Sequence, residues 1–191
     1  GKLAQHSTVS PKINDEKCVG CGECEDHCSQ QALAVVDAKA ELNRESCIGC
    51  GECILICPNE AVEIQWDQSI PVFLENMVEY TEGVLKGKEG KSLFLNFITN
   101  ISPACDCCGY NDAPIVGDIG IVASTDPVAI DQASADLVNG ESALPGTCLK
   151  THHGAGEDKF KGLYPKVDWP IQLEYAEEIG LGTREYDLKR I

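Results

Sequence analysis

The sequence is short of basic residues and has no long apolar run, and both shortages limit what the chain can bind. Its 191 residues include 15 Lys and Arg against 31 Asp and Glu, for a formal net charge of −16 at pH 7. Such a surface repels nucleic acid and anionic membranes, so we expect neither as a partner. No segment approaches the ~18 apolar residues that cross a membrane, and the first residues lack the apolar stretch of a signal peptide. The sequence therefore predicts a cytoplasmic protein.

Two fingerprints of cofactor binding are absent as well. The sequence contains neither the G-x-G-x-x-G motif of flavin and nicotinamide sites nor a G-x-x-x-x-G-K phosphate loop. We therefore do not expect the chain to oxidise such cofactors alone. The first residue is Gly and the only methionine is Met77, which indicates a fragment, a processed product or a tagged protein.

Cysteine, by contrast, is abundant, and eight of the twelve cysteines lie in a repeat. When residues 16–35 are placed over residues 45–64, at an offset of 29, Glu, Cys, Gly and Ala residues match in register. Each copy contains C-x2-C-x2-C-x3-C, the spacing of bacterial 4Fe-4S ferredoxins. The first motif consists of Cys18, Cys21, Cys24 and Cys28, and the second of Cys47, Cys50, Cys53 and Cys57.

This spacing predicts that the two motifs exchange their fourth ligands. Three cysteines in one loop surround one cluster, and the fourth, on the outgoing helix, reaches the neighbouring cluster. Zinc is the rival metal for paired C-x2-C motifs, but eight cysteines in two such runs exceed what a tetrahedral structural site uses. We assign the first 4Fe-4S cluster to Cys18, Cys21, Cys24 and Cys57, and the second to Cys47, Cys50, Cys53 and Cys28.

The repeated spacing also bears on the setting of the protein. Disulfide frameworks do not require it, so we expect a reducing compartment in a prokaryotic anaerobe or another low-oxygen setting.

Residues between the ligands have expected roles too. Val19 and Ile48 should cover the clusters, and residues 54–56 should bury the exit of the second loop. The first loop carries Glu25, Asp26 and His27 there, and for these a solvated helix face is favoured over an electron entry point with proton coupling at the histidine. Glycines should let the loops wrap closely and aim N–H groups at the sulfurs, namely Gly20, Gly22, Gly49 and Gly51.

The periodicity of the chain changes after Trp66. Each cysteine motif predicts a short helix that begins near the fourth cysteine, then an apolar strand at residues 32–36 or 61–64. Beyond them we expect a helix over residues 69–85 with Ser69 as its cap, strands at 93–98 and 119–123, a helix from Asp126-Pro127 to Asn139-Gly140, and a last helix over 168–179. The run at 93–98 is rich in large apolar residues and predicts a buried strand. Alternation of strands and helices predicts an α/β layer.

The remaining cysteines suggest a second site. A C-x-C-C run follows the strand at 93–98, and Asp126 follows the strand at 119–123. If both strands are parallel, both loops lie at the carboxyl edge of the sheet, where α/β proteins bind ligands. Structural thiols or adventitious metal binding are the alternatives, because neighbouring cysteines cannot all easily ligate one ion. The candidate metal or substrate site consists of Cys105, Cys107 and Asp126, and Cys148, His152 or His153 could join it; the role of Cys108 is left open.

Several further motifs carry a family resemblance. They are residues 1–7, Cys105-Asp106-Cys107, residues 111–120, residues 124–131 and the tail around 168–176. These motifs resemble the DUF362 family, which the resemblance implies is an iron–sulfur family with a two-cluster ferredoxin module embedded in an α/β protein. The resemblance also implies that this chain is the C-terminal portion and that a larger N-terminal α/β portion is missing. Ser29, where proline is usual, and the extra thiol of Cys108 depart from the family pattern but remove no cluster ligand.

Together these features predict an α+β protein with three segments. A lead-in covers residues 1–12, a bacterial-type two-cluster ferredoxin module covers 13–66, and an α/β domain, incomplete if the N-terminal portion is missing, covers 67–191. The leading hypothesis is low-potential one-electron transfer through two 4Fe-4S clusters to or from a partner protein or domain, which we expect to carry a basic docking patch. One alternative is an oxidoreductase or metallocofactor-related enzyme with a site at the Cys105-Asp106-Cys107 and Asp126 loops, fed by the clusters. In the other, the clusters only staple a binding domain. The sequence favours an electron-transfer protein or redox subunit over a complete enzyme.

Overall fold

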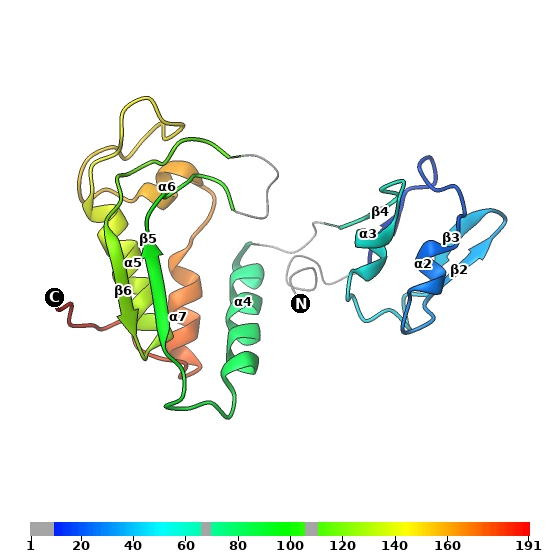
Figure 1. Cartoon of the computed structure of the whole chain (residues 1–191), viewed down its shortest axis with the longest axis horizontal. Helices are drawn as coiled ribbons and strands as arrows, with labels where there is room; N and C mark the ends of the chain where they lie inside the picture. Colours follow the sequence, from blue (N-terminus) through cyan, green and yellow to red (C-terminus); the bar gives the residue numbers. More distant parts are fainter. Residues whose placement is uncertain (1–9, 66–69, 106–110) are drawn as a thin grey trace. The chain divides into compact units, whose positions relative to one another are not determined.

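The computed structural model describes residues 10–65, 70–105 and 111–191. Contacts divide the chain into two units, Gly1–Phe73 and Leu74–Ile191, which we call the cysteine-rich unit and the larger unit (Figure 1). The sequence predicts a domain boundary after Trp66. The division by contacts falls later, between Phe73 and Leu74, inside a helix that begins at Ile70. Among the described residues, no helix has both the length and the apolarity to cross a membrane.

Within residues 10–65, the cysteine-rich unit contains two antiparallel strand pairs and two short helices. The expected apolar strands are confirmed as β2, which pairs with β3, and β4, which pairs with β1. The order of elements is β1 (Lys12–Ile13), α2 (Glu23–Asp26), β2 (Leu33–Val36), β3 (Lys39–Leu42), α3 (Glu52–Ile56) and β4 (Val62–Glu63).

Strand pairing in this unit follows the internal duplication. Lys12 pairs with Glu63, and the residues 29 positions away from each, Glu41 and Ala34, pair in the same way. Hydrogen bonds repeat as well: the Asn14 N–H donates to the Ala61 carbonyl at 2.7 Å, and the Asn43 N–H donates to the Ala32 carbonyl at 2.7 Å. The unit therefore has pseudo-twofold symmetry.

Both short helices lie earlier in the chain than the sequence predicts. Each contains the third cysteine of its motif and ends before the fourth, so the fourth cysteine follows the helix instead of lying on it. Gly22 and Gly51 precede the helices with φ of 87° and 77°, conformations that glycine adopts without strain. Cys57 has an extended backbone because the following Pro58 disfavours the helical region for it.

The described residues of the larger unit add one two-stranded sheet and four helices. The helices expected over residues 69–85, 126–140 and 168–179 are confirmed as α4, α5 and α7, whereas α6 was not predicted, and the Ser69 cap lies outside the described residues. The elements are α4 (Ile70–Leu85), β5 (Phe94–Ile98), β6 (Gly120–Ser124), α5 (Pro127–Gly140), α6 (Lys159–Leu163) and α7 (Pro170–Glu178).

The expectation of parallel strands is wrong, because β5 and β6 are antiparallel. Ser124 pairs with Phe94, and Gly120 pairs with Ile98. One face of this sheet packs on α5, where Ile98 and Val138 belong to the same buried cluster (Figure 1). The opposite face is exposed, with Phe97 at 63%. The strand expected to be buried is therefore buried on one face only, and the molecule is of the α+β class.

A second buried cluster joins α4 to the other helices of the larger unit. Val78 of α4 packs with Val128 of α5 and with Leu173 and Ala176 of α7. The larger unit therefore has a hydrophobic core that needs no bound group.

Candidate metal centre

Two cavities of similar size lie in the cysteine-rich unit, and cysteines line both. They enclose about 340 and 360 Å³, counting space open to solvent. Each is lined by three cysteines of one motif and by the fourth cysteine of the other. The first cavity is lined by Cys18, Cys21, Cys24 and Cys57, and the second by Cys28, Cys47, Cys50 and Cys53. The structure thus brings together the two crossed sets that the spacing predicts.

These thiols are also a large part of the hydrophobic core of their unit. Cys18 and Cys24 are buried with Leu33, Ala40 and Ala61, and further cysteines pack against this cluster. All ten cysteines that the structure describes are free of disulfide bonds. The core is therefore built largely from side chains that can bind metal.

Backbone amides donate hydrogen bonds to three of these sulfurs. Ala32 and Ala61 donate to the Sγ atoms of Cys28 and Cys57 at 3.3 and 3.2 Å, in equivalent positions of the two halves. Ala40 donates to Cys18 Sγ at 3.3 Å. Amides near sulfur favour a negatively charged thiolate, the form that ligates metal. The sequence predicts glycines as the donors to the sulfurs, but these described bonds come from alanines. The match of Ala32 with Ala61 in the repeat was the sequence signal that could have pointed to these two donors.

The glycines instead shape the backbone of the loops. Gly20 and Gly49 have φ of 65° and 67°. Gly20 also lies against the turn between β2 and β3, since a Cβ atom on it would meet the Ala38 carbonyl oxygen at 2.4 Å. Only glycine fits this position without a backbone shift.

Burial makes two of the thiols that line the cavities, those of Cys24 and Cys53, poorer acids. It raises the pKa of Cys24, and it raises the pKa of Cys53 to about 11, with a smaller contribution from negative charge at Cys50 and Cys47. Four thiolates around one cavity repel each other, so ionising them all requires a cationic group among them. The donor set therefore fits a group that contains several metal ions bridged together and ligated by thiolates.

A single ion fits the described residues less well. Among residues 10–65, 70–105 and 111–191, no three Cys, His, Asp or Glu side chains lie close enough together to hold one ion.

The apolar residues beside the ligands lie where the sequence predicts only in part. Val19 lines the first cavity and Ile48 the second, although both are more than half exposed. The expectation that residues 54–56 bury the exit of the second loop is wrong for Leu55, which α3 places outward at 84% exposure. His27 is exposed, with Nδ1 2.9 Å from the Glu23 carbonyl oxygen, as a solvated helix face requires.

The reasoning behind the second candidate site is corrected by the antiparallel sheet. Cys105 follows the Ile98 end of β5 and Asp126 follows the Ser124 end of β6, and these ends lie on opposite edges. Asp126 instead caps α5: its Oδ1 accepts hydrogen bonds from the N–H groups of Val128 and Ala129 at 2.8 and 2.9 Å. Cys107 and Cys108 lie outside the described residues.

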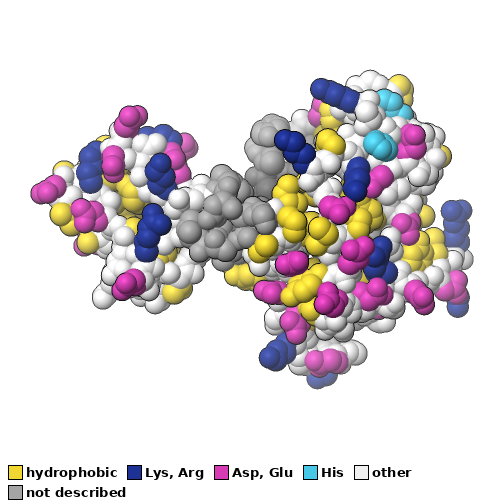
Figure 2. All heavy atoms as spheres, turned by 180° about the vertical axis from the view of Figure 1, so that it is seen from behind, with side chains coloured by type: hydrophobic (Ala, Val, Ile, Leu, Met, Phe, Trp, Pro, Cys, Tyr) yellow, Lys and Arg dark blue, Asp and Glu magenta, His cyan; other side chains and the backbone are white. Residues whose placement is uncertain are grey.

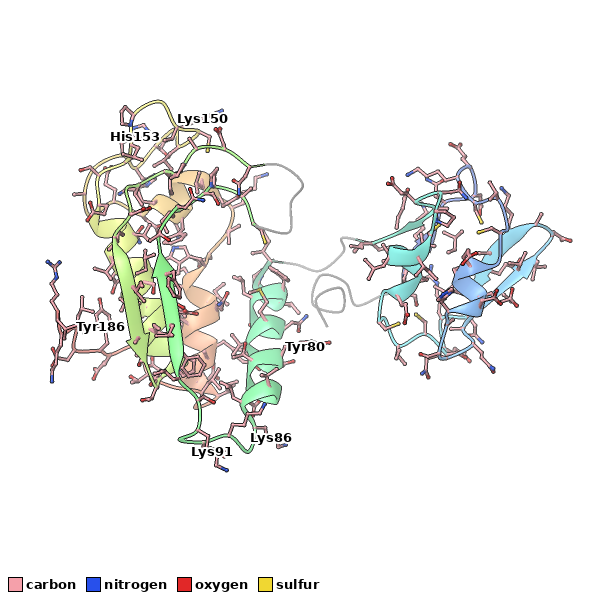
Figure 3. All side chains as sticks on the ribbon, in the orientation of Figure 1. Tyr80, Lys86, Lys91, Lys150, His153 and Tyr186 are labelled. Atoms are coloured by element: carbon pink, nitrogen blue, oxygen red, sulfur yellow. The ribbon has the colours of Figure 1, made fainter. Side chains whose placement is uncertain are left out.

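The other residues proposed for that site have structural contacts. Cys148 packs against the core of the larger unit. His153 Nε2 lies 2.7 Å from the Leu149 carbonyl oxygen, and His152 Nδ1 lies 3.0 Å from Thr151 Oγ1. Figure 3 shows His153 in the loops beside α6, far along the larger unit from Lys86 and Lys91 in the α4–β5 connection. The thiol of Cys148 thus fits the structural alternative.

Comparison with known proteins now adds a family. Residues 2–136 match the family described as domain of unknown function (DUF362). The chain belongs to the DUF362 family. The DUF362 match includes both cysteine motifs and Asp126, whereas Cys148, both histidines after it and the tail motifs lie beyond it. No curated protein matches the chain.

One charged residue beside the first cavity was missed by the sequence analysis. Lys39 Nζ donates to the carbonyl oxygens of Asp15 and Cys18 at 2.6 and 2.5 Å. No motif marks this lysine, because its contacts arise only when the β2–β3 turn folds back onto the first cysteine loop.

Proposed function

We propose that the cysteine-rich unit binds two 4Fe-4S clusters and that the protein transfers single electrons at low potential to or from a partner. One observation carries the proposal. Each cavity is lined by three cysteines of one motif and by the fourth of the other, which is the arrangement that the ligand exchange of two-cluster ferredoxins requires. Two antiparallel strand pairs with pseudo-twofold symmetry support a bacterial-type ferredoxin module in this unit.

The residues around the cavities would hold such clusters and tune them. When bound, each cluster supplies reversible one-electron chemistry. The eight thiolates ligate iron, and the amides of Ala32, Ala40 and Ala61 stabilise negative charge on three sulfurs. Val19 and Ile48, which line the cavities, limit the access of water to them.

Charge supports a basic redox partner. Residues 1–73 contain twelve Asp and Glu against five Lys and Arg. Figure 2 shows acidic side chains spread over the visible face of both units. Such a field steers a partner with a basic docking patch toward the protein and weakens with salt. The exposed thiols of Cys21 and Cys50 further favour a reducing, low-oxygen cytoplasm as the setting.

The second proposed partner of this chain is the N-terminal α/β portion that the family resemblance implies. The outer face of the β5–β6 sheet supports it, because Leu95, Phe97 and Ile121 are exposed there. Two strands are also fewer than a sheet usually needs for independent stability. We propose that this portion packs on that face.

The enzyme hypothesis has lost its geometric basis, since the Cys105 and Asp126 loops leave opposite ends of an antiparallel sheet. The staple hypothesis differs from electron transfer in one measurable property. Clusters that relay electrons are reduced reversibly, whereas clusters that only hold the fold together are redox-inert.

Anaerobic purification followed by iron and sulfide analysis tests the proposal. We expect about eight iron and about eight sulfide per chain, with low-temperature EPR signals that appear on reduction near roughly −400 mV. Protein reconstituted without oxygen that holds neither iron nor sulfide would contradict the proposal. Two clusters that cannot be reduced would support the hypothesis that the clusters only hold the fold together.

Crossed ligation makes a sharper prediction. Cys57→Ser should remove the first cluster, although Cys57 lies in the second motif, and the iron content should fall by about half. Adding Cys21→Ser should then cost no further iron, while adding Cys50→Ser should remove the remainder. Cys148→Ser is the matched control, and it should leave the iron content unchanged.

Ligation within each motif predicts the reverse for the double variants. Iron analysis and EPR on the two double variants therefore decide between the arrangements, since only one of them can lose the second half of the iron.

A further inference from the structure

The β2–β3 turn and the first two residues of β3 contact the first cysteine loop at three points. Ala40 donates its N–H to Cys18 Sγ, and Ala38 lies against Gly20. Between them, Lys39 Nζ donates to the carbonyl oxygen of Cys18 at 2.5 Å. One lysine thus places a positive charge on the backbone of a residue that lines the first cavity.

Among the described residues, the Lys39 ammonium forms no hydrogen bond or ion pair with a carboxylate. The hydrogen-bond partners of the Lys39 ammonium among the described residues are two backbone carbonyls, those of Asp15 and Cys18. Its side chain is half-buried, so solvent and salt screen the charge less than at an exposed site. Lys17, next to Cys18 in the chain, differs in this respect, because its Nζ pairs with Glu63 Oε1 at 2.9 Å.

We propose that Lys39 is a positioning residue that raises the reduction potential of the first cysteine site. The proposal rests on the proposed function, since it requires a cluster at that site. Reduction adds one electron and one negative charge, and a nearby fixed positive charge stabilises the reduced form more than the oxidised form. Backbone and sulfur hydrogen bonds from the same turn hold the loop at a constant distance from the ammonium.

The effect is selective for one of the two sites. The described contacts of Lys39 are with the loop of Cys18, whose thiol lines the first cavity, and the second cavity is lined by other cysteines. Two sites that the duplication would make equivalent then differ in potential, and the first accepts an electron before the second. Such a difference gives electron flow through the unit a direction.

Potentiometric titration monitored by EPR tests the proposal, with dithionite as reductant and mediator dyes for equilibration. Lys39→Gln removes the charge but keeps a hydrogen-bond donor for the carbonyls, and Lys39→Arg keeps the charge. We expect Lys39→Gln to retain its iron and sulfide and to shift one of the two one-electron steps to more negative potential. Lys39→Arg should titrate like the wild type.

Lys17→Met is the matched control, because it removes the same charge beside Cys18 but from a paired, exposed side chain. It should shift either step by less than Lys39→Gln does. Equal shifts in these two variants, equal shifts of both steps in Lys39→Gln, or no shift with both clusters retained would each overturn the proposal. If Lys39→Gln loses iron, the same titration is made on Lys39→Met. Two reduction steps at wild-type potentials in Lys39→Met would also overturn the proposal. Wild-type protein without iron and sulfide removes the proposed function itself.

Discussion

Gly20 and Gly49 occupy equivalent positions in the two cysteine loops but have different surroundings. Both have positive φ, and an alanine there costs about 1–2 kcal/mol of strain. A Cβ atom at Gly20 would also meet the Ala38 carbonyl oxygen at 2.4 Å, whereas one at Gly49 meets nothing within 4 Å. We predict that Gly20→Ala lowers the free energy of unfolding by ~1–3 kcal/mol more than Gly49→Ala, because backbone must move. Chemical denaturation followed by circular dichroism measures both, and equal losses would contradict the close contact.

Lys159 is a buried cation in the larger unit, with no exposed surface. Its Nζ donates to the carbonyl oxygens of Gly154, Glu157 and Asn139 at 2.6, 2.8 and 3.3 Å. Lys159→Met leaves these carbonyls without their donor, and we predict a loss of about 3 kcal/mol in the free energy of unfolding. Lys161→Met is the matched control: that lysine is exposed and paired with Asp168, so its loss should change stability little. Comparable losses in the two variants would argue against a structural role for the buried ammonium.

At the scale of elements, α5 depends on the residue that caps its N-terminus. Asp126 caps the helix through Val128 and Ala129, and its other carboxylate oxygen accepts from the Thr183 N–H at 3.0 Å, which ties the C-terminal tail to the helix. We predict that Asp126→Ala costs about 1–2 kcal/mol of stability, whereas Asp126→Asn costs less because asparagine also caps. Thermal unfolding measures the loss. Iron content should not change in either variant, and a fall in iron at full folding would show that Asp126 is a ligand after all.

The same helix shows what sequence patterns predict well. Asp126-Pro127 is a local signal, since capping and the fixed φ of proline act within one turn, and α5 begins there. Cysteine spacing is local too, and the crossed sets follow from it. The signal at Ala32 and Ala61 was equally local but was not used, because alanine has no side-chain chemistry that points to a sulfur.

Strand direction could not be obtained from the strands alone. The apolar run of β5 carries no information about its partner, and its alternation was masked by large residues on both faces. A usable signal lay in the connection to β6. A parallel pair needs a crossover, usually a helix, and the described parts of this connection, residues 99–105 and 111–119, contain none. The assumption of a shared carboxyl edge failed for this reason.

The two short helices show a further limit of patterns. Asp26 and Leu55 are equivalent in the duplication, and both are exposed, although one is charged and the other apolar. Exposure there is set by the position of the helix on the loop, not by the side chain. Four or five residues are too few for a hydrophobic period to indicate the buried side.

At the scale of the whole molecule, the two units differ in what their cores contain. The core of the cysteine-rich unit is small and consists largely of the proposed ligands. The two described clusters of the larger unit consist of buried aliphatic side chains and include none of those ligands. Metal binding should therefore contribute to the folding of the first unit and not to that of the second.

This difference predicts two unfolding transitions that respond differently to the removal of metal. Trp169 reports on the larger unit, because its indole N–H donates to Asp158 at 3.0 Å and its ring lies 5.5 Å from that of Phe160. The chain has two tryptophans, so Trp66→Phe leaves Trp169 as the sole fluorescent reporter of that class.

In this variant, removal of iron by an anaerobic chelator should abolish the unfolding transition of the cysteine-rich unit, followed by circular dichroism. The transition temperature of the larger unit, followed by Trp169 fluorescence, should not change. The reason is that the proposed crossed ligation would make each cluster hold both halves of the cysteine-rich unit, while no proposed ligand belongs to the described core around Trp169. Without a chelator, Cys57→Ser should weaken the unfolding transition of the cysteine-rich unit and leave that of the larger unit unchanged. A Trp169 transition that falls together with the iron content would mean that the two units fold as one.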